Sequence, residues 1–146
     1  MCKIMVFTYN YYFKPRHADF DEYGIAHHSK YFCWFEEARY ECFEQFGEAF
    51  NNLYTLYKFP LSDAKVKYLR PVADTRELCV KVSIELPIKV AVLKIGYRLV
   101  EKTTGILLAK GYTNHVFTNK RLELLTKVPK EFLEIVNMLM ENQNEQ

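Results

Sequence analysis

The sequence of 146 residues lacks long hydrophobic runs, and it has little excess charge of either sign. No stretch approaches the roughly 18 uninterrupted apolar residues of a membrane span. The segment from Met1 to Phe13 is broken by polar residues, unlike a signal peptide. We therefore expect a cytoplasmic protein without a membrane span. The formal net charge is only +2 and no more than two basic residues are adjacent, so nucleic acid is not an expected partner.

The four cysteines form no C-x-x-C pair, and the chain has no clustered set of Cys and His. This scatter argues against a disulfide framework or a zinc site, so we expect reduced thiols, no metal and no cofactor. An apolar share of 49% is enough to fill one core. We expect one domain over residues 1–128, with residues 129–146 forming a C-terminal helix and polar tail packed on it.

The strands that the sequence predicts share an alternation of apolar and polar residues with a period of two. They are expected at 4–13, 64–68, 78–84, 89–100 and 106–117. The last two should form a hairpin through the turn-rich link at residues 101–105. The segment 51–60 is irregular in pattern and predicts neither a helix nor a strand.

One long helix is predicted from Ser29 to Phe46, with apolar residues at helical spacing and a narrow acidic stripe on the opposite side. Ser29 would be its N-cap and Gly47 would mark its C-terminal cap. Pro129 could open a shorter last helix, followed by a polar tail over residues 142–146. One apolar helix followed by successive antiparallel strands predicts an α+β fold in which a sheet of about five strands wraps the helix.

The most informative motif surrounds the start of this helix and resembles the 4-hydroxybenzoyl-CoA thioesterase family of hotdog proteins, which includes the acyl-CoA thioesterases found beside the Tol-Pal genes. The positions that carry the resemblance are Asp19, Asp21, Gly24, Ile25, Tyr31, Phe35, Glu36, Ala38 and Arg39. A later Tyr68-x-Arg70-Pro71 resembles the end of the family's second strand. The resemblance implies a hotdog fold and hydrolysis of an aliphatic or aromatic acyl-CoA.

By this resemblance Asp21 is the catalytic group, as a nucleophile or as a general base for water; both mechanisms stay open. The resemblance also makes the backbone N–H of His28 the donor to the thioester carbonyl, because the first amides of a helix have no intrahelical partner. Gly24 would let the backbone approach the ligand. Without the motif, Asp21 would be an ordinary turn residue that caps a local N–H.

The resemblance assigns further substrate contacts to Ile25, Tyr31 and Lys89. Family members carry basic residues in the turn before the fourth strand, and Lys89 is the one basic residue of the segment 86–91. This thin basic lining leaves an acyl carrier protein open as the alternative to coenzyme A. We expect the side chains of His27 and His28 to point in different directions and therefore not to share a metal ion.

Glu36 and Glu37 could act as catalytic carboxylates, but an ion pair for Glu36 and a solvated position for Glu37 are the simpler interpretations. A hotdog dehydratase is disfavoured because no proline follows either His27 or His28. A non-catalytic hotdog module that binds acyl groups or only assembles is disfavoured by the presence of Asp21. The resemblance implies a homodimer or homotetramer in which a residue of the partner faces Asp21.

Overall fold

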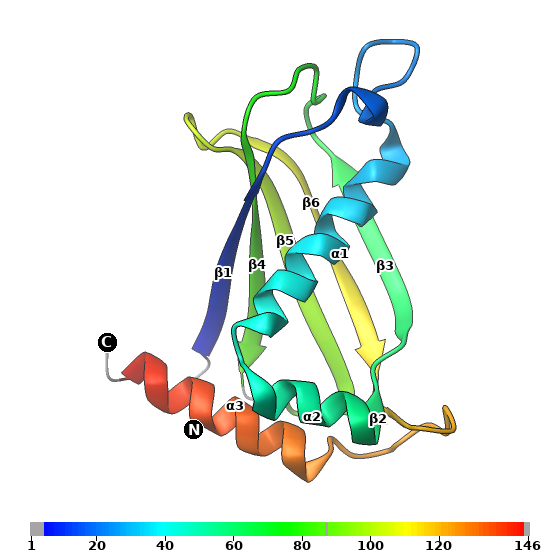
Figure 1. Cartoon of the computed structure of the whole chain (residues 1–146), viewed down its shortest axis with the longest axis vertical. Helices are drawn as coiled ribbons and strands as arrows, with labels where there is room; N and C mark the ends of the chain where they lie inside the picture. Colours follow the sequence, from blue (N-terminus) through cyan, green and yellow to red (C-terminus); the bar gives the residue numbers. More distant parts are fainter. Residues whose placement is uncertain (1–4, 87, 145–146) are drawn as a thin grey trace.

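A curved antiparallel sheet and the helix that it wraps organise the computed structural model, which describes residues 5–86 and 88–144 (Figure 1). The five strands stand in the order β1-β4-β5-β6-β3. Their bounds are β1 Met5–Phe13, β3 Leu61–Tyr68, β4 Leu78–Leu86, β5 Val92–Glu101 and β6 Leu107–Val116. The period-two pattern thus predicted each strand of this sheet. The predicted start of β1, residue 4, lies outside the described residues.

The β5–β6 hairpin confirms the predicted pairing of the last two strands. Its register places Tyr97 opposite Gly111 and Leu99 opposite Ala109, all on the face toward the core. A side chain at Gly111 would collide with the backbone carbonyl of Lys65 on β3 and approach the Phe35 ring. Glycine is therefore required at this position between β3 and α1.

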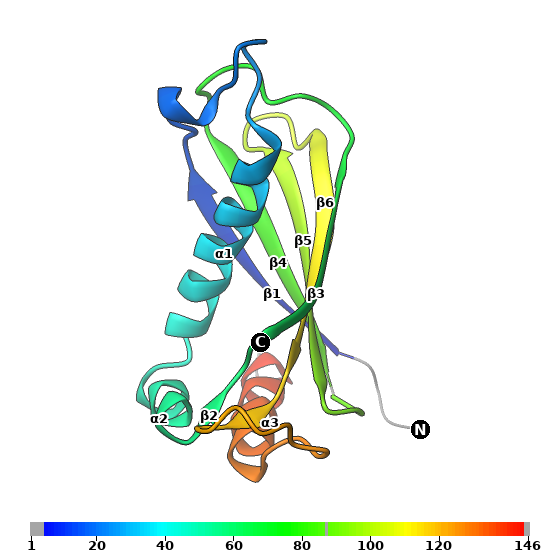
Figure 2. The ribbon, with the colours of Figure 1, turned by 90° about the vertical axis from the view of Figure 1, so that its right-hand side faces the viewer.

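Helix α1 (His28–Glu44) lies across one face of the sheet, and in Figure 2 the opposite face has no helix over it. Phe35, Ala38 and Cys42 of α1 are fully buried against the strands. The Phe35 ring stacks on Tyr97 with centroids 4.6 Å apart and an angle of 3° between the ring planes. Burial of one such side chain contributes about 1.5–3 kcal/mol, so this stripe fixes the helix to the sheet.

The ends of α1 differ from the prediction. His27, not Ser29, is the N-cap, because its ring accepts a hydrogen bond from the Ser29 N–H. The helix ends at Glu44 with Gln45 as C-cap, and Gly47 instead starts the next helix at φ +73°. A positive φ suits glycine because it has no Cβ. Gly47 therefore separates two helices.

The segment that was predicted to be irregular contains the helix α2 (Glu48–Leu56) and the short strand β2 (Tyr57–Lys58). Strand β2 pairs with β7 (Thr118–Asn119). The final helix, α3 (Lys130–Asn144), begins after Pro129 as predicted and extends further into the polar tail. Its buried face joins the same hydrophobic core as α1 and α2, through Phe132, Ile135 and Val136.

A buried chain of hydrogen bonds crosses the core beneath α1. Arg39 donates to the Tyr97 hydroxyl at 3.2 Å, and this hydroxyl lies 2.7 Å from Oγ1 of Thr113. Thr113 Oγ1 lies 2.9 Å from Nε2 of His115, whose Nδ1 is 3.0 Å from the carbonyl oxygen of Phe59. Both ring nitrogens of this buried histidine are therefore satisfied, as buried polar groups generally are.

Candidate active site

The loop between β1 and α1 folds back on itself and holds Asp21 in a tight turn. The Asp21 N–H donates to the carbonyl of Ile25 at 2.8 Å, and the Gly24 N–H donates to the carbonyl of Asp21 at 3.0 Å. Gly24 has φ +78°, a conformation in which a Cβ is strained. The glycine in the motif is thus explained by the turn that presents Asp21.

The Asp21 carboxylate is fixed through one of its two oxygens. Oδ1 accepts the N–H of Tyr23 at 2.8 Å and that of Ile25 at 3.4 Å. None of the hydrogen bonds within residues 5–86 and 88–144 uses Oδ2. The local cap and the catalytic role are therefore compatible, because the cap leaves the second oxygen free.

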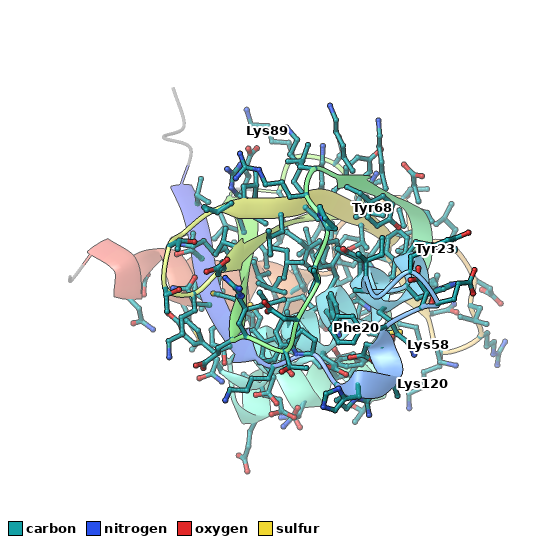
Figure 3. All side chains as sticks on the ribbon, turned by 90° about the horizontal axis from the view of Figure 1, so that it is seen from above. Phe20, Tyr23, Lys58, Tyr68, Lys89 and Lys120 are labelled. Carbon is teal, nitrogen blue, oxygen red and sulfur yellow. The ribbon has the colours of Figure 1, made fainter. Side chains whose placement is uncertain are left out.

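This carboxylate lines a hollow of about 340 Å³ between the loop, the first turn of α1 and the end of β3. The residues that surround it are Asp21, Ile25, Ala26, His28, Tyr31, Tyr68, Leu69, Arg70 and Pro71. Figure 3 looks onto this end of the molecule and labels Tyr68 at the end of β3 and Tyr23 on the loop. The structure thus brings together four of the predicted site residues: Asp21, Ile25, His28 and Tyr31.

The first turn of α1 supplies polar groups to the hollow. His28 is the first helical residue, and within the described residues its N–H donates to no protein acceptor. An N–H at this position has no intrahelical partner and lies at the positive end of the helix dipole. It is therefore available to an anionic or carbonyl oxygen of a ligand.

Two aromatic rings, from α1 and from the end of β3, line the hollow. The Tyr31 and Tyr68 rings meet edge to face with centroids 4.8 Å apart. Burial raises the pKa of Tyr31, and burial likewise raises that of Tyr68, so both phenols are neutral hydrogen-bonding groups at physiological pH. Tyr31 thus lines the hollow, and its role in binding a substrate stays a prediction.

A second carboxylate, Asp19, supports the loop from inside. It is buried and accepts the backbone N–H of Arg16 at 2.9 Å through Oδ2, while its carbonyl accepts the N–H of His27. Lys30 approaches Oδ1 at 4.0 Å. Because these contacts join both ends of the loop, Asp19 positions the segment that carries Asp21.

Two of the predicted substrate contacts do not line this hollow. Gly24 acts through the turn, and Lys89 lines a separate depression at the β4–β5 connection. Strand β4 runs from Leu78, which pairs with Phe13 just before the Asp21 loop, to Leu86 at the other end. Along a strand this is roughly 27 Å, so within one chain Lys89 cannot share a ligand atom with Asp21.

The two adjacent histidines differ from the expectation that they point apart. Their rings face each other with centroids 4.1 Å apart, because His27 folds back to cap the helix. Among the described residues no group of three or more Cys, His, Asp or Glu side chains is placed to hold a metal ion. Glu36 lies 3.9 Å from Arg39, and Glu37 accepts the Tyr11 hydroxyl, both away from the hollow.

The sequence of this chain matches a known protein superfamily over most of its length. The model of the thioesterase-like superfamily matches residues 15–136, which include the whole hollow. The chain belongs to this superfamily. Membership in the thioesterase-like superfamily supports the general activity that the motif implied, while the narrower 4-hydroxybenzoyl-CoA subfamily stays a prediction. No protein of curated function matches the sequence.

Solved structures of other proteins share the fold of this superfamily member. A hypothetical protein from Aquifex aeolicus is 25% identical with a TM-score of 0.76, and covers 88% of this chain and 98% of its own. DHNA-CoA thioesterase from Staphylococcus aureus is 18% identical, with a TM-score of 0.77 and 94% of each chain covered. The 1,4-dihydroxy-2-naphthoyl-CoA thioesterase from Synechocystis, also 18% identical, has a TM-score of 0.77 and covers 91% and 98%. The predicted hotdog fold is confirmed.

The residues that sequence reasoning gave no role are those of the opposite wall, from Tyr68 to Pro71. The Tyr-x-Arg-Pro motif was visible, but nothing in the sequence places it beside Asp21. Arg70 is the one arginine or lysine among the described residues that line this hollow. No helix in the described part of this thioesterase-like chain is long and apolar enough to cross a membrane.

Proposed function

We propose that this protein hydrolyses the thioester of an aliphatic or aromatic acyl-CoA in the hollow beside Asp21. The observation that carries the proposal is that a carboxylate with one free oxygen and an unpaired helix N-terminal amide line the same hollow. Thioester hydrolysis needs both a group that attacks or activates water and a donor for the oxygen that gains charge.

In this proposal Asp21 Oδ2 either attacks the thioester carbon or removes a proton from a water molecule that attacks it. The carbonyl oxygen becomes negative in either route, and the His28 N–H donates to it. The C–S bond then breaks: in the general-base route protonated Asp21 returns its proton to the leaving sulfur, and in the nucleophilic route a thiolate leaves and takes a proton from water. In the nucleophilic route, water hydrolyses the resulting anhydride and restores the carboxylate of Asp21.

The proposed substrate contacts beyond the reacting group follow from the walls of the hollow. Ile25 and the Tyr31 ring would contact the acyl group, and Gly24 would shape the turn. Arg70 is suited to the phosphates of coenzyme A, because a guanidinium binds phosphate through two parallel hydrogen bonds. Lys89 would contribute only from a second subunit.

A homodimer or homotetramer is part of the proposal, with the active sites at the dimer interface. Strand β3 is an edge strand, and its final residue, Tyr68, lines the hollow. Pairing of two β3 edges would therefore bring residues of a partner to Asp21, and would satisfy the unpaired backbone groups of that edge.

The experiment that tests the function is an assay of thiol release from a panel of aliphatic and aromatic acyl-CoAs. Asp21→Asn should reduce turnover by at least about 1000-fold, because an amide neither attacks nor accepts the proton. Glu134→Gln, at an exposed position of α3 away from the hollow, is the matched control and should behave as wild type. Undiminished turnover by Asp21→Asn would refute the role of Asp21, and no turnover of any CoA ester by the wild type would refute coenzyme A as carrier.

A further inference from the structure

The face of the sheet that lies away from α1 is strongly basic. Side chains tipped with nitrogen stand out from this face in Figure 3. Six exposed cations point outward from four adjacent strands: Lys65, Lys67, Lys81, Lys94, Arg98 and Lys110. We call this set the basic face. Within the described residues, none of these six cations lies within 4.0 Å of a carboxylate oxygen.

Four of these cations stand in a single row across the sheet. Lys67 pairs with Lys110, Lys110 with Arg98, and Arg98 with Lys81 in the strand register. Like charges directly opposite one another on neighbouring strands destabilise a sheet. The row therefore costs stability in the isolated protein, and an anion bound across it would relieve this repulsion.

Solubility alone does not explain this arrangement. A soluble surface generally mixes both signs of charge evenly, whereas this side of the sheet carries six cations against two carboxylates, Asp63 and Glu85, in a chain whose formal net charge is only +2. The remaining surface is thus net acidic. The α1 side carries exposed Glu37, Glu41 and Glu44, so the two sides of the molecule have opposite charge.

The basic face is also hollowed beside the row. A depression of about 510 Å³ is lined by Lys65, Lys67, Arg98 and Lys110, with Gly96 and Ser83 among its other residues. A Cβ at Gly96 would lie 2.7 Å from Oγ of Ser83, so these two small residues are in close contact at the bottom of the depression. The depression lined by Lys89 shares Ser83 and Gly96 with this one, so the two depressions are adjacent on the sheet.

We infer that the basic face binds an acidic α-helix of a partner protein, lying across the strands along the row Lys67–Lys110–Arg98–Lys81. Neighbouring strands are about 4.8 Å apart, so the four cations span roughly 14 Å. Glutamates on one side of a helix recur every turn, at about 5.4 Å. The two repeats match closely enough for one carboxylate to meet each cation over three turns.

Other occupants fit the row less well. A single phosphate is too short for it, and single-stranded nucleic acid is usually held by exposed aromatic platforms. Of the two aromatic residues that line the depression, Tyr97 is buried in the core and stacks on Phe35. Lys94 covers the ring of the other, Tyr112, whose hydroxyl donates a hydrogen bond to Asp63. The acidic α1 of a second copy would make a heterologous contact, which gives rings or open filaments.

The test uses two fluorescent helical peptides of about 20 residues and identical composition. In one peptide the glutamates lie on a single face, and in the other they are distributed around the helix. Anisotropy titration at about 0.15 M salt should show that wild type prefers the single-face peptide. Arg98→Gln/Lys110→Gln should bind it about tenfold more weakly, while the matched control Lys120→Gln/Arg121→Gln should bind as wild type.

Equal affinity for both peptides would overturn the inference, as would tighter binding of anionic lipid vesicles or a single-stranded oligonucleotide. Salt-sensitive self-association that the Arg98/Lys110 variant abolishes would assign the face to α1 of a second copy instead. Urea unfolding of this variant should show equal or higher stability than wild type, and a lower stability would contradict the cost assigned to the row. Binding is measured without turnover, so its failure leaves the proposed hydrolysis untouched.

Discussion

The hydroxyl of Tyr68 donates a hydrogen bond to the backbone carbonyl of His28 across 3.0 Å, and so ties the end of β3 to the first turn of α1. A hydrogen bond of this kind contributes about 0.5–1.5 kcal/mol. Its position matters more than its energy, because the same helical turn carries the free N–H of His28. The orientation of that amide is set by a strand from a distant part of the sequence.

The role of the His28 amide can be tested without removing the helix. His28→Pro deletes the N–H at the first helical position, where proline is well tolerated, and the preceding His27 is already extended at ψ 139°. We expect kcat for acyl-CoA hydrolysis to fall about 100 to 1000-fold. His28→Ala keeps the N–H and should retain most activity. Equal activity of the two variants would place the oxyanion donor elsewhere.

Substitutions of Arg70 and of Lys89 should have different effects on the KM for an acyl-CoA. Arg70 lines the Asp21 hollow, so Arg70→Gln should raise KM for an acyl-CoA about tenfold with a smaller change in kcat. Lys89→Gln should change neither constant if each chain binds its substrate alone, because Lys89 lies at the other end of β4. A rise in KM for Lys89→Gln comparable to that for Arg70→Gln would show that Lys89 reaches the substrate from a second subunit.

Acid should destabilise the fold through His115. Burial, and then the charge of Arg39, lowers its pKa below the ordinary 6.5, so the unfolded chain binds this proton more readily than the folded one. The stability that the neutral ring contributes is complete above about pH 6.5 and declines as the pH falls below it. Urea unfolding between about pH 7.5 and 5.5 should show a shallower pH dependence for His115→Asn than for wild type. His17→Asn, at an exposed site, should retain the wild-type slope.

Two glycines on adjacent strands should respond differently to the same substitution. Gly111→Ala should lower the free energy of unfolding by about 1–3 kcal/mol, because its Cβ meets the rigid backbone of Lys65. Gly96→Ala meets only the Ser83 hydroxyl, which can rotate, so its effect should stay below about 1 kcal/mol. Equal losses in thermal or urea unfolding would contradict the assigned contact at Gly111.

The sequence predicted those parts of the fold that depend on periodic patterns. The strands and α1 bury one face each, and their spacing of apolar residues records this directly. Helix α2 was not predicted because just two of its residues, Phe50 and Leu53, are buried, and two positions do not make a recognisable helical pattern. The N-cap was misplaced because a histidine takes the role that serine usually has.

The candidate site was predictable on one side only. Asp21, Ile25, His28 and Tyr31 lie within one continuous motif, so their proximity follows from local sequence. The opposite wall begins at Tyr68, and its position depends on how β3 crosses the sheet. Lys89 was assigned from its turn, but the direction of β4 places that turn at the far end. Such long-range relationships are set by strand order rather than by local pattern.

The turn that holds Asp21 is secured by main-chain atoms: Ile25 and Gly24 contact it through backbone groups, and Ala26 donates its N–H to the carbonyl of Val72. Main-chain contacts do not depend on the identity of the exposed side chains beside them. Residues such as Glu22 and Tyr23 can therefore mutate while the carboxylate keeps its place. The rim of the hollow is free to diversify toward new acyl groups over evolution without dismantling the reacting centre.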